Sequence, residues 1–171
     1  MNLKIEQMEK LMICATKPYE ITWNEKVYCD TVKESELKEM INLYYSVYSK
    51  SHVQSVARQK YEYYDALLKE QINDIDCDYS SIIHDSKTHE IIAVCLVQEW
   101  EQLPYILDIV VNPMYQNQGI GEMMIKKVLH RAKDKYPAIR LSVNPGNPAE
   151  YLYHKLGFIG GTITYKLKYE N

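Results

Sequence analysis

The chain has 171 residues, the usual size of a single domain. With 46% hydrophobic and 25% charged residues, its composition excludes an intrinsically disordered chain and a coiled coil. The net charge of −3 argues against a nucleic-acid partner held mainly by phosphate contacts.

Membrane insertion, secretion and metal binding are not indicated either. The longest apolar run, residues 91–97, is too short to span a bilayer. The first residues mix acids with lysines and contain no apolar core with a cleavage site, so we expect no signal peptide. Four cysteines are scattered without the spacing of a zinc site or a disulfide framework: Cys14, Cys29, Cys77 and Cys95. We therefore expect reduced thiols in a cytoplasmic protein, with no metal and no membrane partner.

The first half of the chain is predicted to be mostly helical. A stripe of apolar residues predicts a helix over residues 3–15. Residues 20–32 predict a hairpin, or a strand with a loop. Apolar residues at helical spacing predict two further helices, over 37–48 and 53–72, and an acidic loop follows at 74–78.

From residue 80 the pattern changes from helix to strand. Short runs rich in Ile and Val predict an antiparallel meander of strands at 80–84, 90–100 and 104–111. An amphipathic helix follows at 119–135 and ends before Pro137. The last predicted elements are a buried strand at 138–144, a short helix at 147–156 and one or two strands at 158–170. This order predicts a three-layer α-β-α sandwich around a mixed, mostly antiparallel sheet.

All six glycines follow residue 118, and two of them lie between a predicted strand and a predicted helix. In Gln116-Asn-Gln-Gly-Ile-Gly121, Gly119 and Gly121 allow backbone N–H groups and the positive end of the helix to approach an anion closely. Met124 stands where a dinucleotide fingerprint needs its third glycine and where a P-loop needs its second, so neither motif is present. A plain turn at the start of a helix is the alternative reading.

The signature Gln/Arg-x-x-Gly-x-Gly/Ala is matched by residues 116–121, and a second motif, Asn-Pro-Ala-x-x-Leu-Tyr-x-x-x-Gly-Phe, is matched by residues 147–158. Both motifs, in this order, resemble those of the GNAT superfamily of acyl-CoA-dependent N-acyltransferases. Residues 107–113 are similar to the family's strand and the Val-x-Pro turn before the first motif. The resemblance covers about residues 80–160 and implies a GNAT-like fold.

For domain organisation, the resemblance implies a GNAT-like domain over residues 26–171. Residues 1–25 lie outside it and are expected to form an N-terminal extension that is packed on the domain or appended to it.

The resemblance also implies where acetyl-CoA binds as a co-substrate. The family holds the pyrophosphate with the amides of the glycine turn, and the residues so placed or flanking it are Gln116, Asn117, Gln118, Gly119, Ile120 and Gly121. The pantetheine arm is expected in a splay between the strand that ends near Val111 and the strand at 138–144. Backbone N–H groups expected to stabilise the oxyanion belong to Ile109, Val110 and Val111. Asn147 is expected to contact the pantetheine, and capping the helix that begins at Pro148 is its alternative role.

Three side chains are candidates for catalysis. Tyr153 lies on an apolar helical stripe that by itself favours a core position, but the family tyrosine that it matches sits near the sulfur and protonates the departing thiolate. Asp108 stands in a strand of apolar residues, where an unpaired charge is costly, and it corresponds to an acidic position that some family members use near the amine. Glu99, in the neighbouring strand, is the other candidate base. The alternative for both acids is a surface or ion-paired carboxylate.

Together these features imply an N-acetyltransferase that moves an acetyl group from acetyl-CoA to a primary amine by direct attack in a ternary complex. No cysteine falls in a matched motif, so a covalent enzyme intermediate is not expected. The acceptor is expected to be a small-molecule amine or a peptide amino group, and the acids favour a cationic one. Alternatives are a non-catalytic acyl-CoA-binding sensor or scaffold, and a purely structural domain. A homodimer is an expectation from the resemblance alone.

Overall fold

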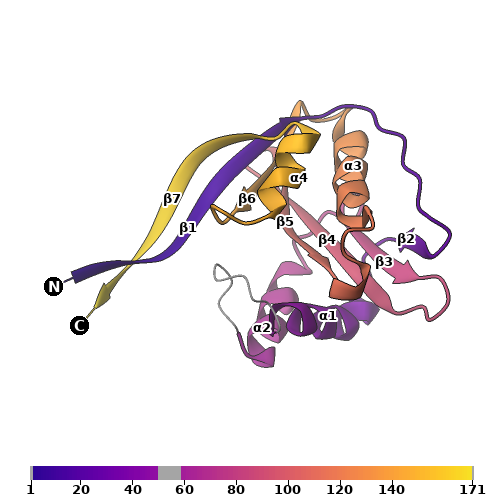
Figure 1. Ribbon diagram of the computed structural model, residues 1–171, viewed down its shortest axis with the longest axis horizontal. Helices are drawn as coiled ribbons and strands as arrows, with labels where there is room; N and C mark the ends of the chain where they lie inside the picture. Colours follow the sequence, from indigo (N-terminus) through magenta and orange to yellow (C-terminus); the bar gives the residue numbers. More distant parts are fainter. Residues whose placement is uncertain (1, 50–58, 171) are drawn as a thin grey trace.

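The computed structural model describes residues 2–49 and 59–170, and within them a seven-stranded mixed sheet separates two layers of helices (Figure 1). The strands lie in the order β2-β3-β4-β5-β6-β1-β7. Their bounds are β1 Asn2–Ala15, β2 Val27–Asp30, β3 Ser81–Asp85, β4 Ile91–Trp100, β5 Leu103–Val111, β6 Ala138–Val143 and β7 Ile159–Glu170. The helices are α1 Leu37–Ser49, α2 Tyr61–Gln71, α3 Ile120–Ala132 and α4 Ala149–Leu156, with 3-10 turns at Glu34–Glu36 and Pro113–Tyr115. The predicted three-layer α-β-α sandwich is confirmed.

The meander β3-β4-β5 is antiparallel, as the sequence predicts. In β4, all seven residues from Ile91 to Val97 are buried, because helices cover both faces of the sheet there: α1 and α2 on one side, α3 and α4 on the other. The crossover through α3 then places β6 parallel to β5.

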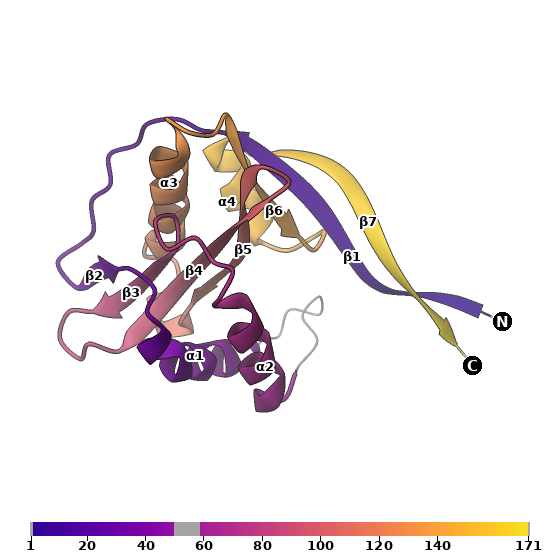
Figure 2. The ribbon, with the colours of Figure 1, turned by 180° about the vertical axis from the view of Figure 1, so that it is seen from behind.

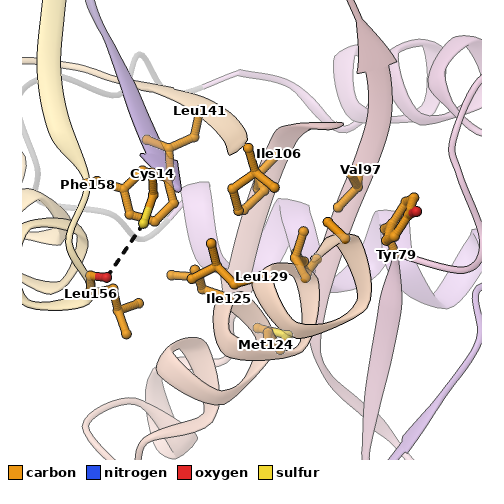
Figure 3. Packing of buried hydrophobic residues seen from close by; sticks show 14 of the residues in the cluster. Cys14, Tyr79, Val97, Ile106, Met124, Ile125, Leu129, Leu141, Leu156 and Phe158 are labelled. Atoms are coloured by element: carbon orange, nitrogen blue, oxygen red, sulfur yellow. Dashed lines mark hydrogen bonds between the residues drawn. The ribbon is translucent and has the colours of Figure 1, made fainter. Parts of the chain in front are cut away.

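Each helical layer covers its own apolar core. Between the sheet and α3 and α4, the buried residues include Met12, Met124, Leu129 and Phe158, and Figure 3 shows part of this cluster, with the Cys14 thiol donating to the carbonyl of Leu156. On the opposite face, α1 and α2 pack on the sheet through a second set of buried residues: Met40, Ile41, Tyr44, Tyr64, Leu68, Val94, Leu96 and Val110.

The helix predicted over residues 3–15 is wrong: this segment is the strand β1. It lies inside the sheet, antiparallel to β6 over Lys10–Ala15 and to β7 over almost its whole length. The alternation of a strand buries Met12 and Cys14 on the α3–α4 face. Pairing with strands more than 120 residues away therefore overrides a local helical stripe.

Beyond the sheet, β1 and β7 continue as a two-stranded ribbon, here called the arm (residues 2–9 with 164–170). Figures 1 and 2 both show the arm extending away from the helices, with the two chain ends at its tip. Since β6 stops pairing at Lys10, the arm's strands bond only to each other, up to the pair Asn2 and Glu170.

Other elements differ from the prediction mainly in their limits. Within 20–32, a single strand, β2, pairs with β3 and no hairpin forms. Of the helix predicted over 53–72, the structure has α2 at Tyr61–Gln71, and residues 53–58 lie outside the described residues. The closing segment is one strand, β7.

Candidate functional site

The strands β5 and β6 pair over only two positions, Tyr105 with Arg140 and Ile106 with Leu141, and then diverge. A cavity of about 320 Å³ lies at the divergence. Ile109, Val110 and Val111 line it along β5, and Val143 and Asn144 lie on the β6 side. The strand edge at this splay is where an extended chain could add to the sheet, so the splay expected for the pantetheine arm is present.

A bulge in β5 directs Asp108 toward α1. The register against β4 shifts at this point: Leu96 pairs with Asp108, whereas Val97 pairs with Ile106. Leu107 is therefore the extra residue, and both its side chain and that of Asp108 lie on the α1 face. The bulge thus directs a carboxylate into a strand face that is otherwise apolar.

Asp108 is half-buried, with protein atoms around most of the carboxyl group and the cavity at its open edge. Burial raises the pKa of Asp108 to about 6. Hydrogen bonds from the Tyr48 hydroxyl and the backbone N–H of Ile109 lower this pKa, but the effect of burial is larger. Among the described residues, no lysine, arginine or histidine pairs with Asp108. Such a carboxylate is ionised at neutral pH, and its raised pKa makes it a better proton acceptor than an ordinary aspartate.

Tyr48 holds this carboxylate and was not singled out from the sequence. Its hydroxyl donates to Asp108 Oδ1 at 2.8 Å. The ring is stacked on Tyr64 at 5.7 Å and meets Tyr44 edge-on at 6.0 Å. Burial and the nearby Asp108 charge raise the pKa of Tyr48 well above its ordinary value, so the hydroxyl remains a donor. The only sequence signal was its place at the end of the apolar stripe of α1.

Tyr153, on α4, faces the same cavity. Its ring packs on Phe158 at 5.8 Å, and none of the described residues forms a hydrogen bond with its hydroxyl. Burial, followed by the charges of Asp108 and Cys95, raises the pKa of the Tyr153 phenol. The cavity therefore brings together a carboxylate ready to accept a proton and a phenol that keeps its own.

The glycine turn forms a second cavity of about 540 Å³, lined by Gln116, Asn117, Gly119, Ile120 and Gly121 together with the first turn of α4. Gly119 has φ +80° at the start of α3, a conformation that glycine adopts without strain. A Cβ on Gly121 would meet only ordinary contacts, so the turn needs glycine at position 119 more than at 121. The N–H groups of the first turn of α3 are available to an anion there.

The two cavities are neighbours, because they share five lining residues: Ile109, Val111, Gln116, Ala149 and Tyr153. The Gln116 amide donates to the Val111 carbonyl at 2.9 Å and so ties the turn to the end of β5. Gln118 does not line either cavity, since its amide donates back to the carbonyl of Met114. A ligand with an anionic part at the turn and an extended arm along β5 fits this connected shape.

Asn147 lines the first cavity, and its side-chain oxygen accepts a hydrogen bond from the Ala149 N–H at the start of α4. The capping role is therefore present, and a contact with pantetheine stays a prediction.

Glu99 does not join the other candidates, and its prediction as a base is corrected here. It is exposed, lies opposite Pro104 beyond the splay, and accepts a hydrogen bond from the Tyr136 hydroxyl at 2.6 Å. Glu99 lies three positions along β4 from Leu96, the partner of Asp108, and does not line the cavity.

No group of three or more His, Cys, Asp or Glu side chains within residues 2–49 and 59–170 could hold a metal ion. In the same ranges, none of the helices is long and apolar enough to cross a membrane.

A model of the acetyltransferase (GNAT) family matches residues 37–158. Among solved structures, the chain is similar to a GCN5-related N-acetyltransferase from Sphaerobacter thermophilus, with a TM-score of 0.72 and 16% identity over 96% of this chain and 51% of that one. It is also similar to the ribosomal-protein-S18-alanine N-acetyltransferase from Escherichia coli, with a TM-score of 0.57 and 17% identity over 77% of this chain and 76% of that one. An acetyltransferase from Trypanosoma brucei matches with a TM-score of 0.55 and 17% identity, over 80% of this chain and 94% of that one.

At these identities the solved structures show a common fold. The chain spans between 51% and 62% of the length of three structures that it matches over nearly all of its own length. No curated protein matches it in sequence.

Proposed function

The chain belongs to the acetyltransferase (GNAT) family, and on this premise we propose that it transfers an acetyl group from acetyl-CoA to a primary amine by direct attack in a ternary complex. The observation that carries the proposal is the connected pair of cavities. One offers the amides of the glycine turn to a pyrophosphate, and the other presents Asp108 and Tyr153 to the reacting groups.

On the donor side, backbone groups do most of the binding. The backbone N–H groups of Gly119, Ile120 and Gly121, which line the second cavity, would hold the pyrophosphate, with the backbone N–H of Gln118 next to them in the turn. The splayed edge of β5 with Asn147 would orient the pantetheine arm. Acetyl-CoA supplies a thioester whose carbonyl oxygen becomes negative during the reaction. Backbone N–H groups at Ile109–Val111 would stabilise that charge.

On the acceptor side, Asp108 takes a proton from the ammonium form of the acceptor and passes it to solvent, and the neutral amine then attacks the thioester carbon. A C–N bond forms and the C–S bond breaks, Tyr153 donates its proton to the departing sulfur, and Asp108 takes the second proton from the nitrogen. The products are an amide and a thiol, and the proton on Asp108 returns through solvent to the phenolate of Tyr153. The burial that raises the pKa of Tyr153 also favours a protonated thiol beside it.

A direct transfer is supported by the cysteines. None of them lines either cavity, and burial raises the pKa of Cys95, on β4 opposite Ile109 of β5, to about 12. A thiolate is needed for a covalent acetyl-enzyme, so we propose that none forms. The four thiols are all free, in keeping with the cytoplasmic location that we also propose.

The test is initial-rate kinetics of thiol release with acetyl-CoA and a panel of primary amines. Double-reciprocal plots that intersect support the ternary complex, whereas parallel lines would indicate a covalent enzyme intermediate. CoA binding without thiol release from any amine would refute the transferase and favour the sensor. Small amines and peptide amino termini belong in the same panel, and sedimentation of the same sample tests the homodimer.

A further inference from the structure

We propose that the acceptor is a dicationic amine with a short aliphatic chain, and that Glu9 on β1 binds its second ammonium group while the first reacts at Asp108. The proposal rests on the proposed function, which places the reacting amine at Asp108. It assigns a role to the N-terminal segment, for which the family resemblance implied none.

The charged side chains that line the first cavity, among the described residues, are all acidic. Two of its described lining residues, Glu9 and Asp108, carry a carboxylate, and no lysine, arginine or histidine is among them. Other acids near the sheet have partners: Glu150 pairs with Lys10 at 2.8 Å and Glu101 with Arg140 at 2.8 Å. The cavity therefore has two negative charges that its own described lining does not neutralise, which favours a ligand with two positive charges.

The two acids lie on opposite sides of β6 and on the same face of the sheet. Asp108 comes two residues after the last β5–β6 pair, and Glu9 comes immediately before the first β1–β6 pair, Lys10 with Val143. Two strand spacings of about 4.8 Å give roughly 10 Å as the smallest separation of the two backbone positions across β6, and the divergence of β5 from β6 adds to it.

The orientation of Glu9 follows from strand alternation. Lys10 reaches Glu150 on α4, so the side chain before it points to the other face, the one on which Asp108 meets Tyr48. Glu9 is half-buried, and its carboxylate accepts a hydrogen bond from the side-chain amide of Gln7, which leaves acceptor positions open.

The lining includes two apolar side chains on the α1 face, Val47 from α1 and Leu107 from β5, beside the polar Ser142 and Asn144 on the β6 side. Methylene groups can pack against the apolar side chains, while an anionic linker would be repelled by both carboxylates. A monoamine would neutralise only Asp108 and leave Glu9 facing an apolar chain. A diamine satisfies both carboxylates and fills the space between them.

The experiment is isothermal titration calorimetry at pH 8 with putrescine and with butylamine, which has the same carbon chain but one nitrogen. Each amine is titrated into the protein alone and into the protein with saturating CoA. We expect putrescine to bind about tenfold more tightly than butylamine, an increment typical of a partly desolvated ion pair. Glu9→Gln should remove this preference, chiefly by weakening the binding of putrescine.

Two variants make the test specific. Glu39→Gln, which removes an exposed acid of α1 that does not line this cavity, controls for net charge and should keep the preference. Glu9→Asp, with a side chain shorter by one methylene, should shift the preference toward cadaverine, the diamine longer by one methylene.

Equal binding of putrescine and butylamine to the wild-type protein would overturn the proposal, as would an unchanged preference in Glu9→Gln. Failure of the proposed function is separate. Selective diamine binding that depends on Glu9, without thiol release from acetyl-CoA, would refute the transferase and keep the site. Thiol release with both amines at equal efficiency would keep the transferase and refute the site.

Discussion

Replacing Tyr48 with phenylalanine removes one hydroxyl and tests whether Asp108 is the base. The Tyr48 hydroxyl donates to Asp108 at 2.8 Å and opposes the effect of burial on the carboxyl pKa. Phenylalanine keeps the ring between Tyr44 and Tyr64, so the α1–α2 packing is retained. The expected effect is therefore on the proton affinity of Asp108.

The size of the effect follows from the strength of the bond. A hydrogen bond to a charged group contributes about 1.5–3 kcal/mol, and part of it persists when the carboxyl is protonated. A net loss near the lower limit, about 1.4 kcal/mol, raises the pKa by about one unit, from about 6 to about 7. At pH 6 the ionised fraction of Asp108 then falls from about one half to about one tenth, while at pH 8 both proteins are at least about nine-tenths ionised.

The assay is kcat/KM against pH from 5 to 9 on one amine, expressed as the ratio of variant to wild type so that ionisation of the amine cancels. We expect Tyr48→Phe to lose about fivefold at pH 6 and less than about twofold at pH 8. The matched control is Tyr44→Phe, because Tyr44 lies one turn earlier on α1 and its buried hydroxyl has no partner among the described residues. A pH-independent loss, or the same shift in both variants, would refute the reasoning.

Four further predictions test other parts of the site and fold. Tyr153→Phe should lower kcat about 100-fold with little change in CoA affinity by calorimetry, and an unchanged kcat would exclude it as the acid. Gly119→Val should lower the Tm and weaken CoA binding, because φ +80° costs a β-branched residue about 1–2 kcal/mol, whereas Gly121→Ala should bind CoA normally. Asp108→Asn should abolish turnover yet raise stability. The pKa of Asp108 is about 6 in the folded protein and lower in the unfolded chain, so the stability that protonation contributes is present below about pH 4 and is lost as the pH rises through 6. Asparagine carries no charge at any of these pH values. Relative to wild type, the free energy of unfolding of the variant, measured with urea, should therefore be higher by up to about 3 kcal/mol at pH 8 and unchanged at pH 4. Met12→Ala should cost about 2–5 kcal/mol in the same assay, because Met12 is fully buried, and a cost below about 1 kcal/mol would contradict a β1 strand inside the sheet.

The elements that could be predicted from the sequence are those with local signals. The meander could be predicted because continuous apolar runs suit strands that are buried on both faces. The glycine turn could be predicted because a positive φ favours glycine at position 119. The splay beside β5 came from the family resemblance, and the two-position ladder between β5 and β6 is its structural basis.

What could not be predicted depends on pairing between distant segments. Nothing local in residues 2–15 indicates that they lie between β6 and β7, and their apolar stripe fits a helix as well as a strand. Tyr48 carried no sign of polar chemistry, because a tyrosine on an apolar stripe usually packs in a core. Glu99 and Asp108 look alike in sequence, but the bulge at Leu107 directs Asp108 toward α1, whereas Glu99 lies opposite Pro104 and bonds to Tyr136.

The part of the site proposed to bind acetyl-CoA and the part proposed to bind the amine therefore differ in how well the sequence predicts them. The proposed donor half consists of backbone, with turn amides and a strand edge, and backbone that must bend or be approached closely requires glycine at fixed spacing. The proposed acceptor half consists of side chains of α1, β1 and β5, which come together only when β1 enters the sheet beside β6. Side chains placed by tertiary pairing need no fixed spacing, so they form no motif. With the role proposed for Glu9, acceptor choice can change by substitution at that position while the glycine turn stays the same.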